Sequence, residues 1–246
     1  MTAFMKKAAA LLPVSLAFIT CLLAGQTWAK DEKCFPPIDT NQSQFLVAYG
    51  SLLHDAVREK KLERSVLEQP VWVSGYKRGW LTRDLAGKGN KTHLGVVRED
   101  GQQFNGALVS ISSARLKSLD PEDKGLCRTK LDPGLLIPMA GGALPEKGEI
   151  WLYETRSKQI KKPAANYPIL QSEVDIFLTG CIEQAEQFDL KTFPQQCVDS
   201  TLGWTIHWNN DRHRPSTGKL VQNRRSQIDK LLERLEGDLY EKIRTD

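Results

Sequence analysis

The sequence predicts an α+β fold in which a mixed body over residues 45–160 is followed by a mainly helical extension over residues 161–246. Two observations support this division. Short apolar runs of strand length, separated by turns that contain glycine and proline, fill the first region. In the second region, after Lys162-Pro163, apolar residues recur every three or four positions, which is the period of an amphipathic helix.

The first 29 residues contain the parts of a secretory signal peptide in the expected order. Lys6 and Lys7 precede an uncharged, mostly apolar run over residues 8–24, and Thr27 and Ala29 are small residues at the two positions that signal peptidase reads. We therefore expect cleavage near Ala29 and export of the mature chain, either to the periplasm of a bacterium or to the extracellular medium.

Two alternatives to cleavage, a retained membrane anchor and a lipidated N-terminus, are disfavoured. Pro13 argues against a retained membrane anchor, since it lies in a run close to the lower limit of about 17–20 residues for spanning a bilayer. Thr20 argues against lipidation of Cys21, because it is a poor residue before a lipidated cysteine. After the cleavage point, the polar residues 30–44 are expected to form an N-terminal arm.

Composition excludes several classes of protein. Cleavage leaves 217 residues, enough for one sizeable core with an extension. These residues include 32 basic and 30 acidic side chains, and this near-neutrality argues against a nucleic-acid binder driven by electrostatics. No second apolar run approaches the length of a membrane span, so no stable membrane anchor is expected after cleavage.

Four cysteines remain after cleavage, and an even number in an exported protein predicts two disulfides. Of the three possible pairings we favour Cys181–Cys197, which closes a short local loop, together with Cys34–Cys127, which ties the mature N-terminus to the body. A catalytic thiolate is disfavoured, because no histidine lies in a recognisable cysteine-protease context and because oxidation would consume the thiols.

The body begins with a strand, a tight turn and a helix. Residues 45–49 form a short apolar run that predicts a buried strand. Gly50-Ser51 ends this strand, and Leu52 to Arg64 predicts a charged amphipathic helix. Backbone N–H groups at such a turn can hold a carboxylate or an oxyanion.

Similar patterns predict the remaining elements of the body. Further strands are expected over residues 71–81, 94–98, 104–111, 127–131 and 149–153. Asp100-Gly101 predicts a hairpin turn between two of these strands. Ser112 or Ser113 is expected to cap a short helix that ends at Leu119.

The extension carries two apolar helical stripes. The first consists of Leu170, Val174, Phe177, Leu178, Cys181, Ile182 and Ala185, and the second of Ile228, Leu231, Leu232, Leu235, Leu239 and Ile243. We expect the second stripe to dock on the body or on a second copy of the chain, with attachment to a membrane surface as the alternative. The sequence leaves the oligomeric state open.

Four segments, in their order along the chain, resemble the signature of the γ-glutamylcyclotransferase-like superfamily. They are FLVAYGSLL at 45–53, VSGYKRGW at 73–80, FNGALVSISSARLKSLD at 104–120 and PEDKGLCR at 121–128. A further segment, TLGWTIHWNNDRHRP at 201–215, resembles an extension of some bacterial relatives. The resemblance implies a small, closed or nearly closed mixed β-barrel flanked by helices, with the substrate over the YGSL turn.

The resemblance also implies an activity. In this family the free α-amine of a γ-glutamyl group attacks its own γ-carbonyl, which releases 5-oxoproline and an amine or peptide. The expected partner is therefore a small-molecule γ-glutamyl substrate, and neither a metal nor another cofactor is expected. The resemblance places Tyr49, Gly50, Ser51 and Leu52 in the substrate cradle, where N–H groups would stabilise an oxyanion while a nearby carboxylate acts as the general base.

The acidic segment departs from the family pattern. The family places a catalytic Glu three residues after the Asp of Leu119-Asp120, and in this chain that position is Asp123, while Glu122 comes one residue earlier. Three outcomes are open: Asp123 acts from a shifted backbone, Glu122 is brought in by a local bulge, or catalysis has been lost. Arg128 is either a ligand of the substrate carboxylate or a structural ion-pair partner.

Plainer alternatives exist for these assignments. Tyr49 can be a core aromatic residue, and Glu122 and Asp123 can belong to a solvated loop. Ser51 is not expected to act as a nucleophile, because no G-x-S-x-G motif or paired histidine accompanies it. For the whole protein, the alternatives are a non-catalytic exported binding module that retains the YGSL pocket and an envelope protein that uses the barrel and the C-terminal helix for protein contacts.

The extension also contains a group of polar residues that suggests a metal site. His207, Asp211 and His213 match no standard zinc spacing, so we expect no metal there. We expect Asp211 and Arg212 instead to form an internal ion pair that holds the extension down.

Overall fold

The computed structural model of the chain describes residues 34–83, 89–122, 125–215, 224–235 and 239–243. The signal peptide expected over 1–29 and the candidate base Asp123 lie outside the described residues. Among the helices described, none combines the length and the apolar character that crossing a bilayer requires.

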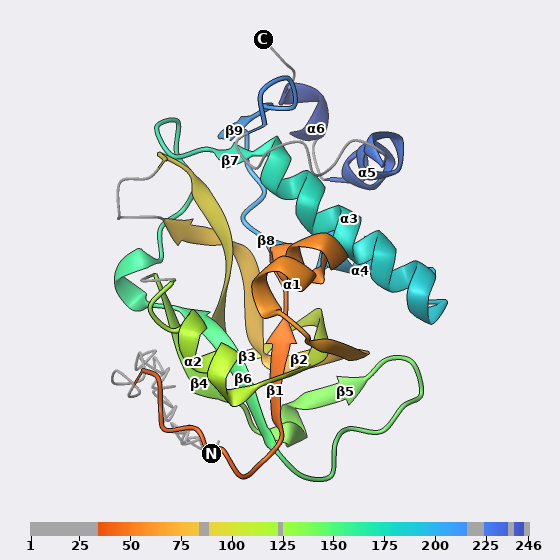
Figure 1. The fold of residues 1–246 in the computed structure, drawn as a ribbon. Coiled ribbons are helices and arrows are strands. Elements are labelled where there is room, and N and C mark those ends of the chain that lie inside the picture. The colour runs from red at the N-terminus through yellow and green to blue at the C-terminus, as the bar shows by residue number, and fades with distance from the viewer. Residues whose placement is uncertain (1–33, 84–88, 123–124, 216–223, 236–238, 244–246) are drawn as a thin grey trace, which may run out of the picture. The chain divides into compact units, whose positions relative to one another are not determined.

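A mixed sheet forms the centre of the described body (Figure 1). Its strands run in the spatial order β4, β6, β1, β3, β2, β5, with β8 paired to β2, and β7 and β9 form a separate pair. Their bounds are β1 Gln44–Ala48, β2 Val66–Arg83, β3 Thr92–Ile111, β4 Leu126–Lys130, β5 Leu136–Pro138, β6 Glu149–Thr155, β7 Ile169–Leu170, β8 Thr201–Leu202 and β9 Trp208–Asn209. The central β1 pairs parallel to β6 and antiparallel to β3.

Helices connect and cover these strands, which confirms the α+β class. The α-helices are α1 Asp55–Leu62, α2 Ser113–Leu119, α3 Gln171–Phe188, α4 Phe193–Asp199, α5 Arg225–Leu232 and α6 Leu239–Lys242, and the 3-10 turns are η1 Gly50–Leu53, η2 Pro133–Leu135 and η3 Ser157–Gln159. The Ser112 hydroxyl accepts a hydrogen bond from Arg115 N, as expected for the N-cap of α2. The long α3 packs against η1, α4 and α5 (Figure 1).

The family resemblance implied a closed or nearly closed barrel, and the structure shows the mixed sheet without closure. Its two end strands, β4 and β5, are not paired with each other. The short β5 ends in Pro138, which has no N–H to offer a further strand. At the other end, Phe35 N donates to the Arg128 carbonyl of β4, so the N-terminal arm contacts this strand.

The hairpin expected at Asp100-Gly101 is also absent, because β3 continues through this position. Residues on both sides of it pair with the same strand, β2: Arg98 lies opposite Tyr76, and Gln103 lies opposite Ser74. The intervening residues form a bulge instead of a turn. Gly75 and Gly101, both at φ +78°, supply the left-handed backbone conformation that this irregularity requires.

Alternating side chains of β1 enter two hydrophobic clusters. Phe45, Val47 and Tyr49 belong to one cluster, with Phe104 among its members. Leu46 and Ala48 belong to another, which also contains Leu116, Leu119, Trp151 and Tyr153. A third cluster joins Leu53 and Trp80 to α3, α4 and the C-terminal stripe.

The docking of the C-terminal stripe on the body is confirmed for its described residues. Ile228 and Leu232 are fully buried in the same cluster as Phe177 of α3. Arg212 pairs with Asp175 on α3 and with Asp229 on α5. These ion pairs join α3, Arg212 and α5 within the extension, and the carboxylate partners of Arg212 differ from the Asp211 that we expected.

Both favoured disulfides are confirmed. Cys34 is bonded to Cys127, which ties the N-terminal arm to β4, and Cys181 is bonded to Cys197, which ties α3 to α4. Cys181 and Cys197 are fully buried, whereas Cys34 is partly exposed.

Candidate active site

The YGSL turn lies directly after the central strand β1. Gly50 has φ +57°, a left-handed conformation that glycine adopts without steric cost. A side chain there would also approach Leu94 Cδ2 to 3.3 Å. The chain then continues as η1, in which Leu52 N bonds to Tyr49 O at 3.2 Å. The first N–H groups of such a turn have no acceptor within it, so those of Gly50 and Ser51 are the ones that could face an anion.

Tyr49 anchors this turn to the neighbouring strand. Its hydroxyl donates to the carbonyl oxygen of Tyr153 on β6 at 2.7 Å, and its ring meets the edge of Phe104 at a centroid distance of 6.0 Å. The side chain is 9% exposed. Tyr49 therefore has the surroundings of a core aromatic residue, and it also fixes the start of the turn.

The far end of the turn is packed against α3. A side chain at Gly180 would overlap the backbone of Leu53 and His54, so the two elements can approach this closely only because residue 180 is a glycine. The Leu53 carbonyl accepts bonds from Arg58 Nη1 at 3.1 Å and from Gln184 Nε2 at 3.2 Å.

A carboxylate from α3 holds the beginning of α1 beside the turn. Glu183 Oε2 accepts a bond from Asp55 N at 2.8 Å, and the same oxygen lies 3.8 Å from His54 Nδ1. Burial raises the pKa of Glu183. His54 Nδ1 accepts a bond from Ala56 N, so His54 caps α1.

Of the two candidate bases, Glu122 and Asp123, the structure describes only Glu122. Glu122 follows α2, its side chain is 47% exposed, and it forms an ion pair with Arg115 Nη1 at 3.0 Å. This surface pair is the arrangement that the solvated-loop alternative describes. Asp123 lies outside the described residues, so its role and that of Glu122 stay predictions.

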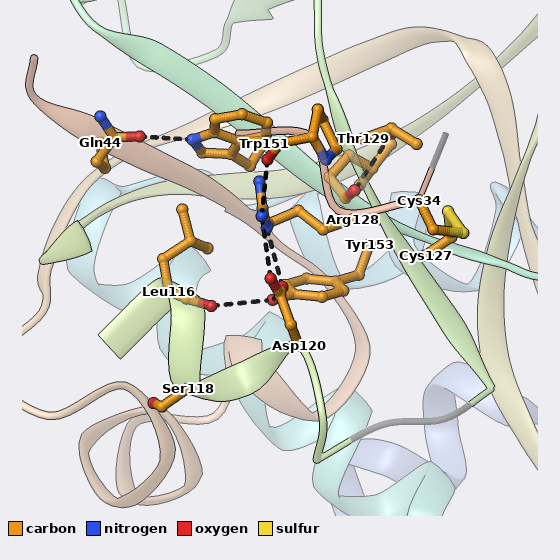
Figure 2. A network of polar contacts seen from close by, with 12 residues as sticks. Cys34, Gln44, Leu116, Ser118, Asp120, Cys127, Arg128, Thr129, Trp151 and Tyr153 are labelled. Atoms are coloured by element: carbon orange, nitrogen blue, oxygen red, sulfur yellow. Dashed lines mark hydrogen bonds and ion pairs between the residues drawn. A yellow bond between two sulfur atoms is a disulfide. The ribbon is translucent and has the colours of Figure 1, made fainter. Parts of the chain in front are cut away.

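Arg128 is engaged in a buried ion pair (Figure 2). Its Nε and Nη2 atoms donate to the two carboxylate oxygens of Asp120 at 2.9 and 3.0 Å, and Nη2 also donates to Pro36 O at 3.1 Å. The guanidinium carbon lies 4.4 Å from the centroid of the Trp151 ring. Of the two roles left open for Arg128, the ion pair is present in the structure, and substrate binding stays a prediction.

Tyr153 completes this network. Its hydroxyl donates to Asp120 Oδ1 at 2.7 Å and lies 3.3 Å from the Leu116 carbonyl (Figure 2). Burial, together with the Asp120 carboxylate, raises the pKa of the Tyr153 phenol well above its usual value. The phenol therefore keeps its proton near neutral pH and acts as a donor.

Asp211, one of the three residues considered for a metal, has other contacts. Asp211 accepts bonds from Ser172 N at 2.8 Å and from Ser172 Oγ at 2.6 Å, so it caps α3. Within the described part of the chain, no three histidine, cysteine, aspartate or glutamate side chains form a cluster that could hold a metal ion.

Sequence reasoning missed two residues that shape this region. Gly180 interrupts the apolar stripe of a long helix, and such an isolated glycine often marks close packing. Tyr153 lies in a predicted strand, where nothing in its local pattern distinguishes it from a core residue. Asp120 was noticed as part of a motif but without a function.

Comparison with known proteins bears on the fold. No protein-family model matches the chain, and a search of curated proteins finds no significant match. Among solved structures, a γ-glutamyl cyclotransferase is similar over 76% of this chain and 99% of its own, with a TM-score of 0.51 and 14% identity. YkqA from Bacillus subtilis matches over 64% of this chain and 53% of its own, with a TM-score of 0.45 and 14% identity.

A third similar structure is a γ-glutamyl cyclotransferase from yeast described as specific to glutathione. It matches over 65% of this chain and 98% of its own, with a TM-score of 0.40 and 8% identity. At these identities the likeness concerns the fold alone. The chain has the fold that the order of its sequence motifs predicted.

Proposed function

We propose that this chain, which has the fold of a γ-glutamyl cyclotransferase, is an enzyme that releases 5-oxoproline from a γ-glutamyl amine or peptide. The observation that carries the proposal is the YGSL turn, which follows the central strand with Gly50 at φ +57° and is anchored to β6 through Tyr49. The fold similarity at a TM-score of 0.51 supports it.

The proposed reaction needs three contributions from the protein. A carboxylate accepts a proton from the α-ammonium group of the substrate, and the resulting amine forms a bond to the γ-carbonyl carbon. The N–H groups of Gly50 and Ser51 stabilise the oxyanion of the tetrahedral intermediate. The bond to the leaving nitrogen then breaks as the carboxylic acid returns its proton to that nitrogen, and the ring nitrogen loses its second proton to solvent, which gives 5-oxoproline and the free amine.

We assign the base to Asp123 and the cradle to Tyr49, Gly50, Ser51 and Leu52. Two arguments support Asp123: the register of the family motif, and the exposed position of Glu122, whose carboxylate is paired with Arg115. The aspartate side chain is one methylene shorter than that of the family glutamate, so the backbone must bring it closer to the substrate. A displacement of about 1 Å would otherwise cost about a hundredfold in rate.

The test is release of 5-oxoproline from a panel of γ-glutamyl amides by the purified, oxidised protein. Asp123→Ala should lower kcat by about a hundredfold or more, which is the usual contribution of a general base. The neighbouring variant Glu122→Ala is the matched control and should retain activity. Loss of activity in Glu122→Ala alone would move the base to Glu122.

A folded protein that releases no 5-oxoproline from any substrate would contradict the enzymatic proposal. A rise in melting temperature with an unhydrolysed γ-glutamyl amide would then support the alternative, a binding module that retains the pocket. Tyr49→Phe should weaken both activity and ligand-induced stabilisation, because it removes the anchor of the cradle to Tyr153.

We also propose that the protein acts after export, as a chain that begins near Lys30. The two disulfides support this proposal, because such bonds persist in oxidising compartments. N-terminal sequencing of the protein recovered from its native compartment should start near Lys30, and a mature protein that still begins at Met1 would contradict cleavage.

A further inference from the structure

The Arg128–Asp120 ion pair places a buried arginine against a partly buried carboxylate. Arg128 is 2% exposed, and among the described residues its Nη1 atom has no hydrogen-bond partner. Asp120 is the C-cap of α2, at the end of a helix where the dipole disfavours a negative charge. Buried ion pairs add little net stability in general, and their best-supported use is to specify geometry.

The geometry that this ion pair specifies is the position at which the acidic segment starts. Asp120 begins this segment, and its carboxylate is held by both Arg128 and Tyr153. At the other end, Arg156 N donates to Gly125 O at 3.0 Å, and Arg156 Nε donates to Leu126 O at 2.9 Å. Both ends of the short segment that carries the candidate bases are therefore fixed to the sheet.

Tyr153 connects this segment to the cradle. Its side-chain hydroxyl donates to Asp120, while its main-chain carbonyl accepts the hydroxyl of Tyr49. The two contacts come from sequence positions 33 and 104 residues away. One residue of β6 thus contacts both parts of the proposed site.

We propose that Tyr153 and Asp120 are positioning residues, which fix the described residues on either side of the acidic segment's candidate base relative to the YGSL turn. This inference rests on the proposed function, since the geometry matters for catalysis only if the segment supplies the base. Neither residue is assigned to the reacting atoms. Arg128 supports them by keeping the Asp120 carboxylate oriented.

The chain offers a matched control for this proposal. Tyr240 donates to Asp229 Oδ1 at 2.6 Å, and Asp229 is paired with Arg212 Nη1 at 2.8 Å. This is the same combination of tyrosine, aspartate and arginine, located in the C-terminal extension. As for Tyr153, burial and the adjacent carboxylate raise the pKa of Tyr240.

The experiment compares Tyr153→Phe with Tyr240→Phe in the full, oxidised protein. Both should lower the melting temperature by similar amounts, because each removes one buried hydrogen bond to a carboxylate. Tyr153→Phe should in addition lower kcat by about tenfold or more with KM changed less than about threefold, since misplacement of a catalytic group acts mainly on the rate. Equal kcat values for the two variants would overturn the proposal.

A second measurement tests the connection without using activity. The shift in urea midpoint caused by Tyr49→Phe should differ between the wild-type and Tyr153→Phe backgrounds, because both substitutions act on the contacts of Tyr153. In the Tyr240→Phe background the same shift should be unchanged. If the wild type releases no 5-oxoproline, the proposed function fails. Separately, if Tyr49→Phe shifts the urea midpoint equally in the wild-type and Tyr153→Phe backgrounds, the proposed connection through Tyr153 is wrong.

Discussion

Two buried arginines, Arg78 and Arg128, and the partly buried Arg212 show how individual charges are accommodated in this protein. Arg128 and Arg212 are paired with carboxylates, whereas Arg78 donates to the Asn105 carbonyl, the Asn105 side-chain oxygen and the Cys197 carbonyl of α4. The Arg78 guanidinium also lies 4.8 Å from the centroid of the Phe177 ring. Burial lowers the pKa of Arg78 to about 9, so it remains charged at neutral pH and joins β2, β3 and α4.

A buried glutamate gives a prediction of pH dependence at the scale of a single residue. Glu173 in the first turn of α3 accepts a bond from Lys91 Nζ at 2.8 Å and lies 3.8 Å from His93 Nδ1. Burial opposes its ionisation, but the neighbouring His93 and the charge of Lys91 outweigh burial and lower the pKa of Glu173 from 4.5 to about 2.

Because the pKa of Glu173 in the folded state is below its usual value, ionised Glu173 stabilises the protein above pH 4.5. This contribution, at most about 3 kcal/mol, is lost as the pH falls from 4.5 towards 2. Urea denaturation of wild type and Glu173→Gln should therefore show a difference in stability at pH 7 that shrinks at pH 3. A difference independent of pH would contradict this assignment.

Packing between elements determines where the YGSL turn lies. The turn is held between β1, which precedes it, and α3, which reaches it from a distant part of the chain through Gly180 and Glu183. The Glu183 carboxylate takes the N–H of Asp55 at the start of α1, a position where negative charge is favoured. The turn is thus positioned by contacts that cross more than a hundred residues of sequence.

At the scale of elements, we predict that Gly180→Ala destabilises the protein. In an isolated helix this change would stabilise by about 1 kcal/mol. Here the new methyl group would overlap the backbone of Leu53 and His54, and such overpacking costs about 1–3 kcal/mol. Gln187→Ala, on the exposed side of the same helix, is the control and should be close to neutral.

Chemical denaturation of both variants measures this effect. Gly180→Ala should also lower 5-oxoproline release more than Gln187→Ala does, because the displaced helix moves the turn. Wild-type stability in Gly180→Ala would show that α3 and η1 are less closely packed than the structure indicates.

The whole molecule is held together by two disulfides with different surroundings. Cys34–Cys127 closes a span of 93 residues next to the partly exposed N-terminal arm, and Cys181–Cys197 closes a span of 16 residues inside the helical cluster. If only the entropy of the unfolded chain is considered, the disulfide that closes the longer loop stabilises the fold by about 1–2 kcal/mol more than the other disulfide does.

We predict that the two bonds differ in their resistance to reduction. A mild reductant under native conditions should reach Cys34–Cys127 first, because Cys34 is partly exposed, whereas Cys181 and Cys197 are fully buried and become accessible only on unfolding. Thiol alkylation followed by peptide mass spectrometry should label Cys34 and Cys127 earlier. Labelling of all four cysteines at one rate would contradict this order.

The sequence by itself determined the features that depend on near neighbours. The α+β class, the strand and turn at residues 44–53, the Ser112 cap and the apolar face of α3 all follow from patterns within a few residues. The favoured disulfide pairing followed from a similar argument, because Cys181 and Cys197 are close in sequence and left the other two cysteines for each other.

Only the tertiary structure decided the features that depend on distant partners. It left the sheet open, turned the expected hairpin at Asp100-Gly101 into a bulge against β2, and gave Arg128 a carboxylate partner in Asp120. It also joined Tyr49 to Tyr153 across 104 residues and Asp55 to Glu183 across 128 residues. Local sequence patterns do not specify such contacts, because each depends on where the packing of the whole core places two separate elements.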